Sequence, residues 1–158
     1  MYWIFAKLTN SFEEWKYFKL NLYTMINEQY DIILFDGVCN LCNNVVRFII
    51  RYDKKQKFRF VSLQSDKGRM LLKANGMKDS ALNSIIFINK KGVFRKSEAA
   101  LNILYDMGYP WKLLYIFILL PRIVRDGIYG VIARNRYRIF GKKNECMIID
   151  EKTGRRVL

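Results

Sequence analysis

The apolar residues in the first half of the chain form short runs separated by charged turns. Residues 30–35 are apolar on both faces of an extended chain, which is typical of a central strand in a parallel sheet. A helix is expected from about 40 to 52, and after the charged turn at 54–57 the alternation over 58–63 predicts a second strand. This spacing predicts a βαβ unit with a right-handed crossover.

The next stretch predicts a helix, a hairpin and another helix. Ser65 or Asp66 is a typical N-cap, Gly76 is typical of the residue that follows a helix, and Ser97 and Gly108 delimit a later helix in the same way. The expected elements are a helix to about residue 75, strands over 84–89 and 93–96, and a helix over 97–107. The order βαβ, helix, ββα is the arrangement of a thioredoxin-like core, so we expect an α/β fold.

Residues on either side of this core predict additional segments. Within 1–29, aromatic residues at spacings of three and four allow a short amphipathic helix. Residues 111–120 are almost wholly apolar, but they are about half of the ~20 residues that cross a bilayer, so a buried helix is expected. Pro121 is expected to open a helix to about residue 134, and Gly141 to end the ordered part.

These segments divide the chain into three parts. We expect an N-terminal extension over 1–29, one thioredoxin-like domain with C-terminal helices over 30–146, and a polar tail over 147–158. The 158 residues, 51% of them hydrophobic and 27% charged, are sufficient for one folded core.

Composition restricts both the chemistry and the location. The chain has no histidine, which excludes Ser-His-Asp and Cys-His catalysis and zinc sites built on imidazole. Three cysteines do not make a secreted disulfide framework, and the N-terminus lacks the order of a signal peptide, so a cytoplasmic location is expected. The net charge of +14 would attract nucleic acid, anionic lipid or acidic protein partners, or would simply form a solvated basic surface.

The candidate chemistry lies in Asp36-Gly37-Val38-Cys39-Asn40-Leu41-Cys42, between the first strand and the first helix. Cys39 and Cys42 are three residues apart, so their side chains share one helix face. A helix N-terminus, with its unpaired N–H groups and positive dipole end, favours the reactive thiolate. Cys39 is nearer the helix start and is expected to be more exposed, so we expect it to attack a disulfide that Cys42 then resolves.

Other interpretations of these residues remain open. Asp36 could cap the helix or exchange protons with Cys42, and capping is favoured. A zinc cage of Asp36, Cys39, Cys42 and Cys146 is conceivable, although Cys146 is more simply a bystander or a transient disulfide partner. A phosphotransferase of the haloacid dehalogenase type fails, because Leu34 occupies the position of its nucleophilic aspartate.

Arginines interleave with aromatic residues between 122 and 140. They could contact phosphates and bases, or they could pair with Asp126 and pack the helices on the domain. The structural interpretation is favoured.

The motif resembles the DCC family of predicted thiol-disulfide oxidoreductases, named for its Asp-x-x-Cys-x-x-Cys signature, for which Asp36, Cys39 and Cys42 stand here. The resemblance covers about residues 31–146. It includes Phe60-Val61-Ser62-Leu63-Gln64-Ser65, Ser97-Glu98-Ala99-Ala100, Pro121, Arg125-Asp126, Tyr129, Asn135-Arg136-Tyr137-Arg138 and Phe140-Gly141. It implies a thioredoxin-like fold and thiol-disulfide oxidoreductase activity. Asn40-Leu41 stands where thioredoxins have Gly-Pro, and Ser84 where they have a cis-proline.

The expected function is therefore thiol-disulfide exchange of the protein-disulfide reductase type, with Cys39, Cys42 and Asp36 as site residues. It requires no bound cofactor and no metal, but it requires a disulfide-containing protein or small thiol substrate and an electron donor. The alternative is a basic module that binds nucleic acid or a membrane surface, in which the cysteines are structural or redox-sensing.

Overall fold

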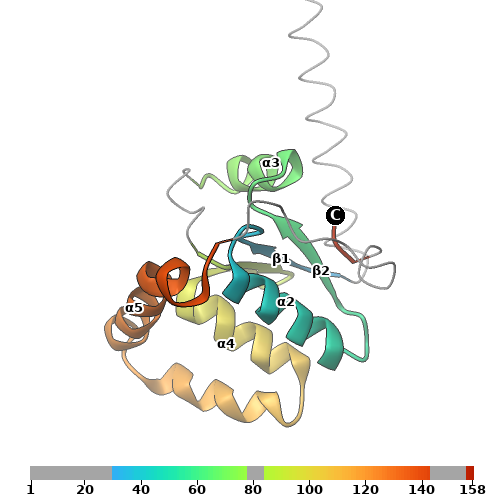
Figure 1. Ribbon diagram of the computed structural model, residues 1–158. Coiled ribbons are helices and arrows are strands. Elements are labelled where there is room, and N and C mark those ends of the chain that lie inside the picture. Colours follow the sequence, from blue (N-terminus) through green and yellow to red (C-terminus); the bar gives the residue numbers. More distant parts are fainter. Residues whose placement is uncertain (1–29, 78–83, 143–155) are drawn as a thin grey trace, which may run out of the picture.

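The computed structural model describes residues 30–77, 84–142 and 156–158. Its elements are β1 (Asp31–Phe35), α2 (Asn40–Tyr52), β2 (Phe58–Ser62), α3 (Asp66–Ala74), β3 (Ile86–Asn89), β4 (Gly92–Arg95), α4 (Lys96–Met107), the 3₁₀ helix η2 (Trp111–Leu119) and α5 (Arg122–Phe140). The strands form one sheet in the order β2–β1–β3–β4, in which β1 is parallel to β2 and antiparallel to β3. The expected α/β class is confirmed, and the arrangement is consistent with a thioredoxin-like core plus a C-terminal helix (Figure 1).

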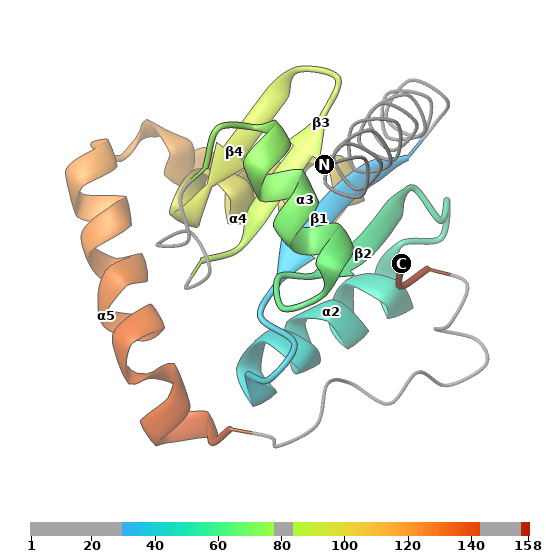
Figure 2. The same cartoon turned by 90° about the horizontal axis from the view of Figure 1, so that it is seen from above.

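The strand β1 is buried on both faces of the sheet, and its successive residues point to opposite sides. Ile33 and Phe35 pack with residues of α2 and α4, whereas Ile32 and Leu34 pack with residues of α3. Helices α2 and α4 therefore cover one face and α3 covers the other, as Figures 1 and 2 show. This explains why residues 32–35 of β1 form a continuous apolar run rather than an alternating one.

Local sequence signals delimit α3 and the end of α4 well, whereas α5 runs to Phe140 instead of ending at about residue 134. Ser65 caps α3, since its Oγ accepts a hydrogen bond from the Gly68 amide at 3.1 Å. Gly76 and Gly108 have φ values of +65° and +82° after their helices, as expected. Ser97 was expected to cap α4, but this is wrong: Arg95 is the N-cap without a side-chain bond, and the Ser97 Oγ donates to Asp126 Oδ1 at 2.5 Å.

The apolar segment after α4 does not form the buried helix expected over 111–120. It forms η2, in which no residue is buried. Trp111 packs against Phe48 and Tyr52 of α2, with ring centroids 4.7 and 5.2 Å away, but Leu119 is 81% exposed. Among the described residues, no helix is long and apolar enough to cross a membrane.

The last three residues lie along the free edge of β2. The Phe60 amide donates to the Arg156 carbonyl, and the Leu158 amide donates to the Phe60 carbonyl, both at 2.8 Å. Arg156 is 6% exposed and forms an ion pair with Asp53. The expectation that Gly141 ends the ordered part is therefore wrong for 156–158, whereas the predicted N-terminal extension lies outside the described residues.

Candidate functional site

The two thiols lie where β1 passes into α2. Cys39 is the N-cap of α2, with extended backbone angles, and its Sγ accepts a hydrogen bond from the Cys42 amide at 3.5 Å. Both cysteines are free thiols. The expected strand, turn and helix are thus confirmed, and Cys39 rather than Asp36 caps the helix.

Cys39 is less accessible than the sequence suggested. Its exposed fraction is 0%, whereas Cys42 is half-buried, so the expectation that Cys39 is the more exposed thiol is wrong. The cover comes from the chain that leaves α5: Lys142 forms an antiparallel bridge with Cys39, and the Asn40 Nδ2 donates to the Phe140 carbonyl at 2.9 Å. Figure 2 shows the end of α5 next to the start of α2.

Asp36 is the acidic partner in a buried ion pair. Its Oδ2 lies 2.5 Å from Arg136 Nη2, and the exposed fractions of the two side chains are 1% and 3%. The Tyr137 hydroxyl also donates to Oδ2, while Oδ1 accepts from Gln64 Nε2 at 2.8 Å and from the Val38 amide at 3.2 Å. Asp36 therefore fixes the turn after β1 and ties it to α5.

Burial dominates the electrostatics of the accessible thiol. Burial, the hydrogen bond with Cys39 and the charge of Asp36 raise the pKa of Cys42 to about 12, against the opposing effect of Arg136. Arg136 Nη1 lies 3.9 Å from the Cys42 Sγ. The sequence predicted an activated thiolate from the helix N-terminus, but for Cys42 the loss of solvation outweighs this effect.

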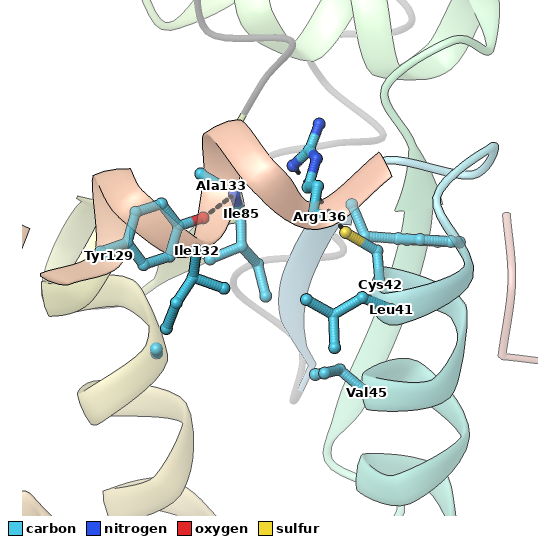
Figure 3. Close-up of a pocket in the computed structure, with 10 residues that line it drawn as sticks. Leu41, Cys42, Val45, Ile85, Tyr129, Ile132, Ala133 and Arg136 are labelled. Carbon is cyan, nitrogen blue, oxygen red and sulfur yellow. Dashed lines mark hydrogen bonds between the residues drawn. The ribbon is translucent and has the colours of Figure 1, made fainter. Parts of the chain in front are cut away.

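A cavity of about 140 Å³ opens beside Cys42. Its walls come from α2, α4, α5, the end of β1 and the residue before β3, and they are mostly apolar side chains. Figure 3 shows the Cys42 sulfur and the Arg136 side chain at one end of this space, with Tyr129 and Ile132 of α5 at the other. Of the two cysteines, Cys42 therefore lines the cavity, whereas Cys39 is not among the lining residues.

Sequence reasoning placed Cys39, Cys42 and Asp36 together but missed the residues that complete the site. Asp36 is contacted by Gln64, which follows β2, and by Arg136 and Tyr137 of α5. Gln64 and the Arg136-Tyr137 pair are part of the segments that resemble the DCC family, which was the one available signal. Their contact with Asp36 was not visible, because Arg136 is 100 residues away.

The arginines of α5 and the possible metal ligands were also considered in the sequence. Arg122 lies 3.7 Å from Asp126, so the expected structural pairing is confirmed for this residue. Within residues 30–77, 84–142 and 156–158, no three His, Cys, Asp or Glu side chains are grouped as metal ligands. Cys146 lies outside these ranges.

Comparisons with known proteins identify relatives. The family model described as DCC1-like thiol-disulfide oxidoreductase matches residues 33–142. The uncharacterized protein YuxK of Bacillus subtilis (strain 168) is 45% identical over 127 residues, which are 80% of this chain and 93% of YuxK. A chloroplastic DCC family protein of Arabidopsis thaliana is 39% identical over 116 residues, 73% of this chain and 67% of that protein. No solved structure matches. Since one relative is named as chloroplastic, the cytoplasmic location stays a prediction.

Proposed function

We infer the function from one premise: the chain belongs to the DCC1-like thiol-disulfide oxidoreductase family. This membership supports thiol-disulfide chemistry in general, with disulfides or thiols as substrates. The finer proposal is that Cys39 and Cys42 carry out dithiol-disulfide exchange and act as a disulfide reductase. The observation that carries it is the position of the two thiols on the first turn of α2, with Cys42 at the wall of a cavity.

We propose that Cys42 meets the substrate first, because Cys39 is fully covered by the segment after α5. Cys42 loses its proton to solvent, and its thiolate attacks the substrate disulfide. A mixed disulfide forms, and the first substrate sulfur leaves as a thiolate and takes up a proton. This order reverses the one expected from the sequence, since it follows accessibility rather than distance from the helix start.

Cys39 then closes the cycle from within the same helix turn. Its Sγ lies 3.5 Å from the Cys42 amide, so it is next to the mixed disulfide. Cys39 loses its proton and attacks the Cys42 sulfur; the Cys39–Cys42 disulfide forms, and the second substrate sulfur leaves as a thiol. Two electrons have passed from the protein to the substrate, and a dithiol donor must reduce the protein again.

Asp36 acts in this proposal as a positioning residue. Both of its carboxylate oxygens accept hydrogen bonds, and through Arg136 it fixes the cation 3.9 Å from the Cys42 sulfur. A positive charge beside Cys42 favours its thiolate and opposes the effect of burial. Asp36 therefore acts on the Cys42 sulfur through Arg136, and it is not the base that removes the thiol proton.

The test uses an aromatic disulfide that releases a coloured thiolate. It is applied to the reduced chain, to Cys39→Ser and to Cys42→Ser, all in a Cys146→Ser background so that the third thiol does not contribute. A chain with both Cys39 and Cys42 should release two coloured thiolates. Cys39→Ser should release one and keep the other half of the reagent as a mixed disulfide, and Cys42→Ser should release none while it is folded. Release from Cys42→Ser at the full rate would restore the opposite order, and equal release from all three would refute the function.

A further inference from the structure

The cavity beside Cys42 has the chemistry of a binding site for an apolar group. Phe35, Leu41, Val45, Ile85, Ile132 and Ala133 give it hydrocarbon walls. It reaches the surface where Val45 and Ile132 are 37% and 49% exposed. A group that enters from solvent at this rim therefore arrives at the Cys42 sulfur.

The polar groups in the wall are occupied by the protein itself. The Tyr129 hydroxyl accepts a hydrogen bond from the Ile85 amide at 3.0 Å, which Figure 3 shows as a dashed line, so its ring forms the wall. The Arg136 guanidinium is bound to Asp36 and to the Tyr137 hydroxyl. A polar substrate group in this space would lose water without equivalent partners, which is unfavourable.

We propose that the cavity selects disulfides that carry an aromatic or branched apolar group next to the reacting sulfur. The proposal rests on the proposed function and names its substrate class. The volume of about 140 Å³ is close to that of an apolar cavity that holds benzene, about 150 Å³. Burial of a ring there should favour such a substrate by about tenfold or more.

Two disulfide peptides that differ only in Phe or Ser beside the cysteine test this proposal. The Phe peptide should be reduced about tenfold faster, and the preference should be lost in Ala133→Leu, which fills the cavity, and weakened in Ile132→Ser at its rim. Gly127→Ala is the matched control on the same helix, since a Cβ there meets nothing within 4 Å. Equal rates for both peptides in the unsubstituted chain would overturn the proposal alone. Equal reduction by the unsubstituted chain, Cys39→Ser and Cys42→Ser would instead overturn the proposed function.

A separate observation concerns the exposed apolar side chains of η2 and α5. Of the eighteen large apolar side chains that are exposed among the described residues, thirteen lie between 113 and 140. Ile116, Leu119, Ile123 and Ile139 are 65%, 81%, 87% and 67% exposed. Monomeric soluble proteins rarely leave so many large apolar side chains in one region in contact with water.

The charge of this region indicates what covers it. Residues 109–142 contain seven Lys or Arg and one Asp, and six of the seven cations are at least partly exposed, since only Arg136 is buried. A second copy would bring two such surfaces of the same sign together, which is unfavourable. An anionic membrane has a hydrocarbon interior under a layer of negatively charged headgroups. It can therefore interact favourably with both the apolar side chains and the cations of this region.

We propose that η2 and α5 bind the surface of an anionic membrane, with their apolar side chains among the lipid headgroups and their cations on the phosphates. The proposed association through η2 and α5 is peripheral. It does not depend on the thiols.

Vesicle sedimentation of the full chain tests this surface. Binding to vesicles with phosphatidylserine should exceed binding to pure phosphatidylcholine by about tenfold and fall at high salt. Leu119→Glu with Ile123→Glu should abolish it, while Val93→Glu, an exposed residue on β4, should not. Equal binding by both variants would overturn the proposal. So would a dimer without lipid that the double substitution dissociates, which would identify a second copy as the occupant.

Discussion

The buried ion pair between Asp36 and Arg136 allows a quantitative prediction. Asp36→Asn keeps the shape of the side chain but removes one of two charges whose side chains are 1% and 3% exposed. Loss of one partner leaves the other charge buried without compensation, which costs ~3–5 kcal/mol. The Asn oxygen can still accept from Gln64 and Val38, so we expect a loss of about 3 kcal/mol, the low end of that range.

Urea unfolding measures this loss as a lower midpoint at unchanged slope. Asp53→Asn is the matched control, because its ion pair with Arg156 is equally buried, with side chains 4% and 7% exposed. Both substitutions should destabilise the fold to a similar extent. Only Asp36→Asn should alter the pH dependence of Cys42 alkylation, since the charge of Asp36 raises the pKa of Cys42.

The double variant Asp36→Asn with Arg136→Met shows whether the unpaired cation is the cause. It should recover much of the lost stability, because both charges are then removed together. A loss below about 1 kcal/mol in Asp36→Asn would refute the reasoning, since an exposed pair contributes no more than that. A double variant less stable than Asp36→Asn would show that the cost lies in packing rather than in charge.

Three further predictions follow from single features. The pKa of Cys42 is raised from 9.0 to about 12 in the folded chain. The stability that the neutral thiol contributes is therefore complete below pH 9 and is lost as the pH rises towards 12. Between these pH values, the urea midpoint should fall less in Cys42→Ser than in the unsubstituted chain. In Gly68→Ala the new Cβ would lie 2.1 Å from the Ser62 carbonyl oxygen, and thermal unfolding should show a loss of about 3 kcal/mol. Tyr129→Phe removes the acceptor of the Ile85 amide and should cost ~1–3 kcal/mol in the same assay.

The sequence was a good guide to structure that depends on neighbouring residues. The Ser65 cap and the glycines at 76 and 108 act within one helix turn, and the helices they delimit were predicted closely. The turn between β1 and α2 was likewise expected, because Asp36-Gly37 directly follows one apolar run and a second apolar run begins at Val45. Such signals need no knowledge of the rest of the chain.

The errors arose where the partner is distant or missing. Cys39 is covered by the segment at Lys142, and nothing near the motif predicts that contact. The apolar run of η2 showed that its side chains avoid water, but not whether the domain has a surface to receive them. The pairing of Asp36 with Arg136 required knowledge of which of several arginines reaches the turn.

The position of Arg136 also sets an order of events during synthesis. At about 5–20 residues per second, the ribosome takes on the order of ten seconds to add the 100 residues between Asp36 and Arg136. In that interval both thiols already exist, but α5, which places a cation beside Cys42, and the segment after it, which covers Cys39, do not. Newly made chains are therefore the population most open to stray oxidation and wrong disulfides, and the protection of these cysteines depends on the age of the chain.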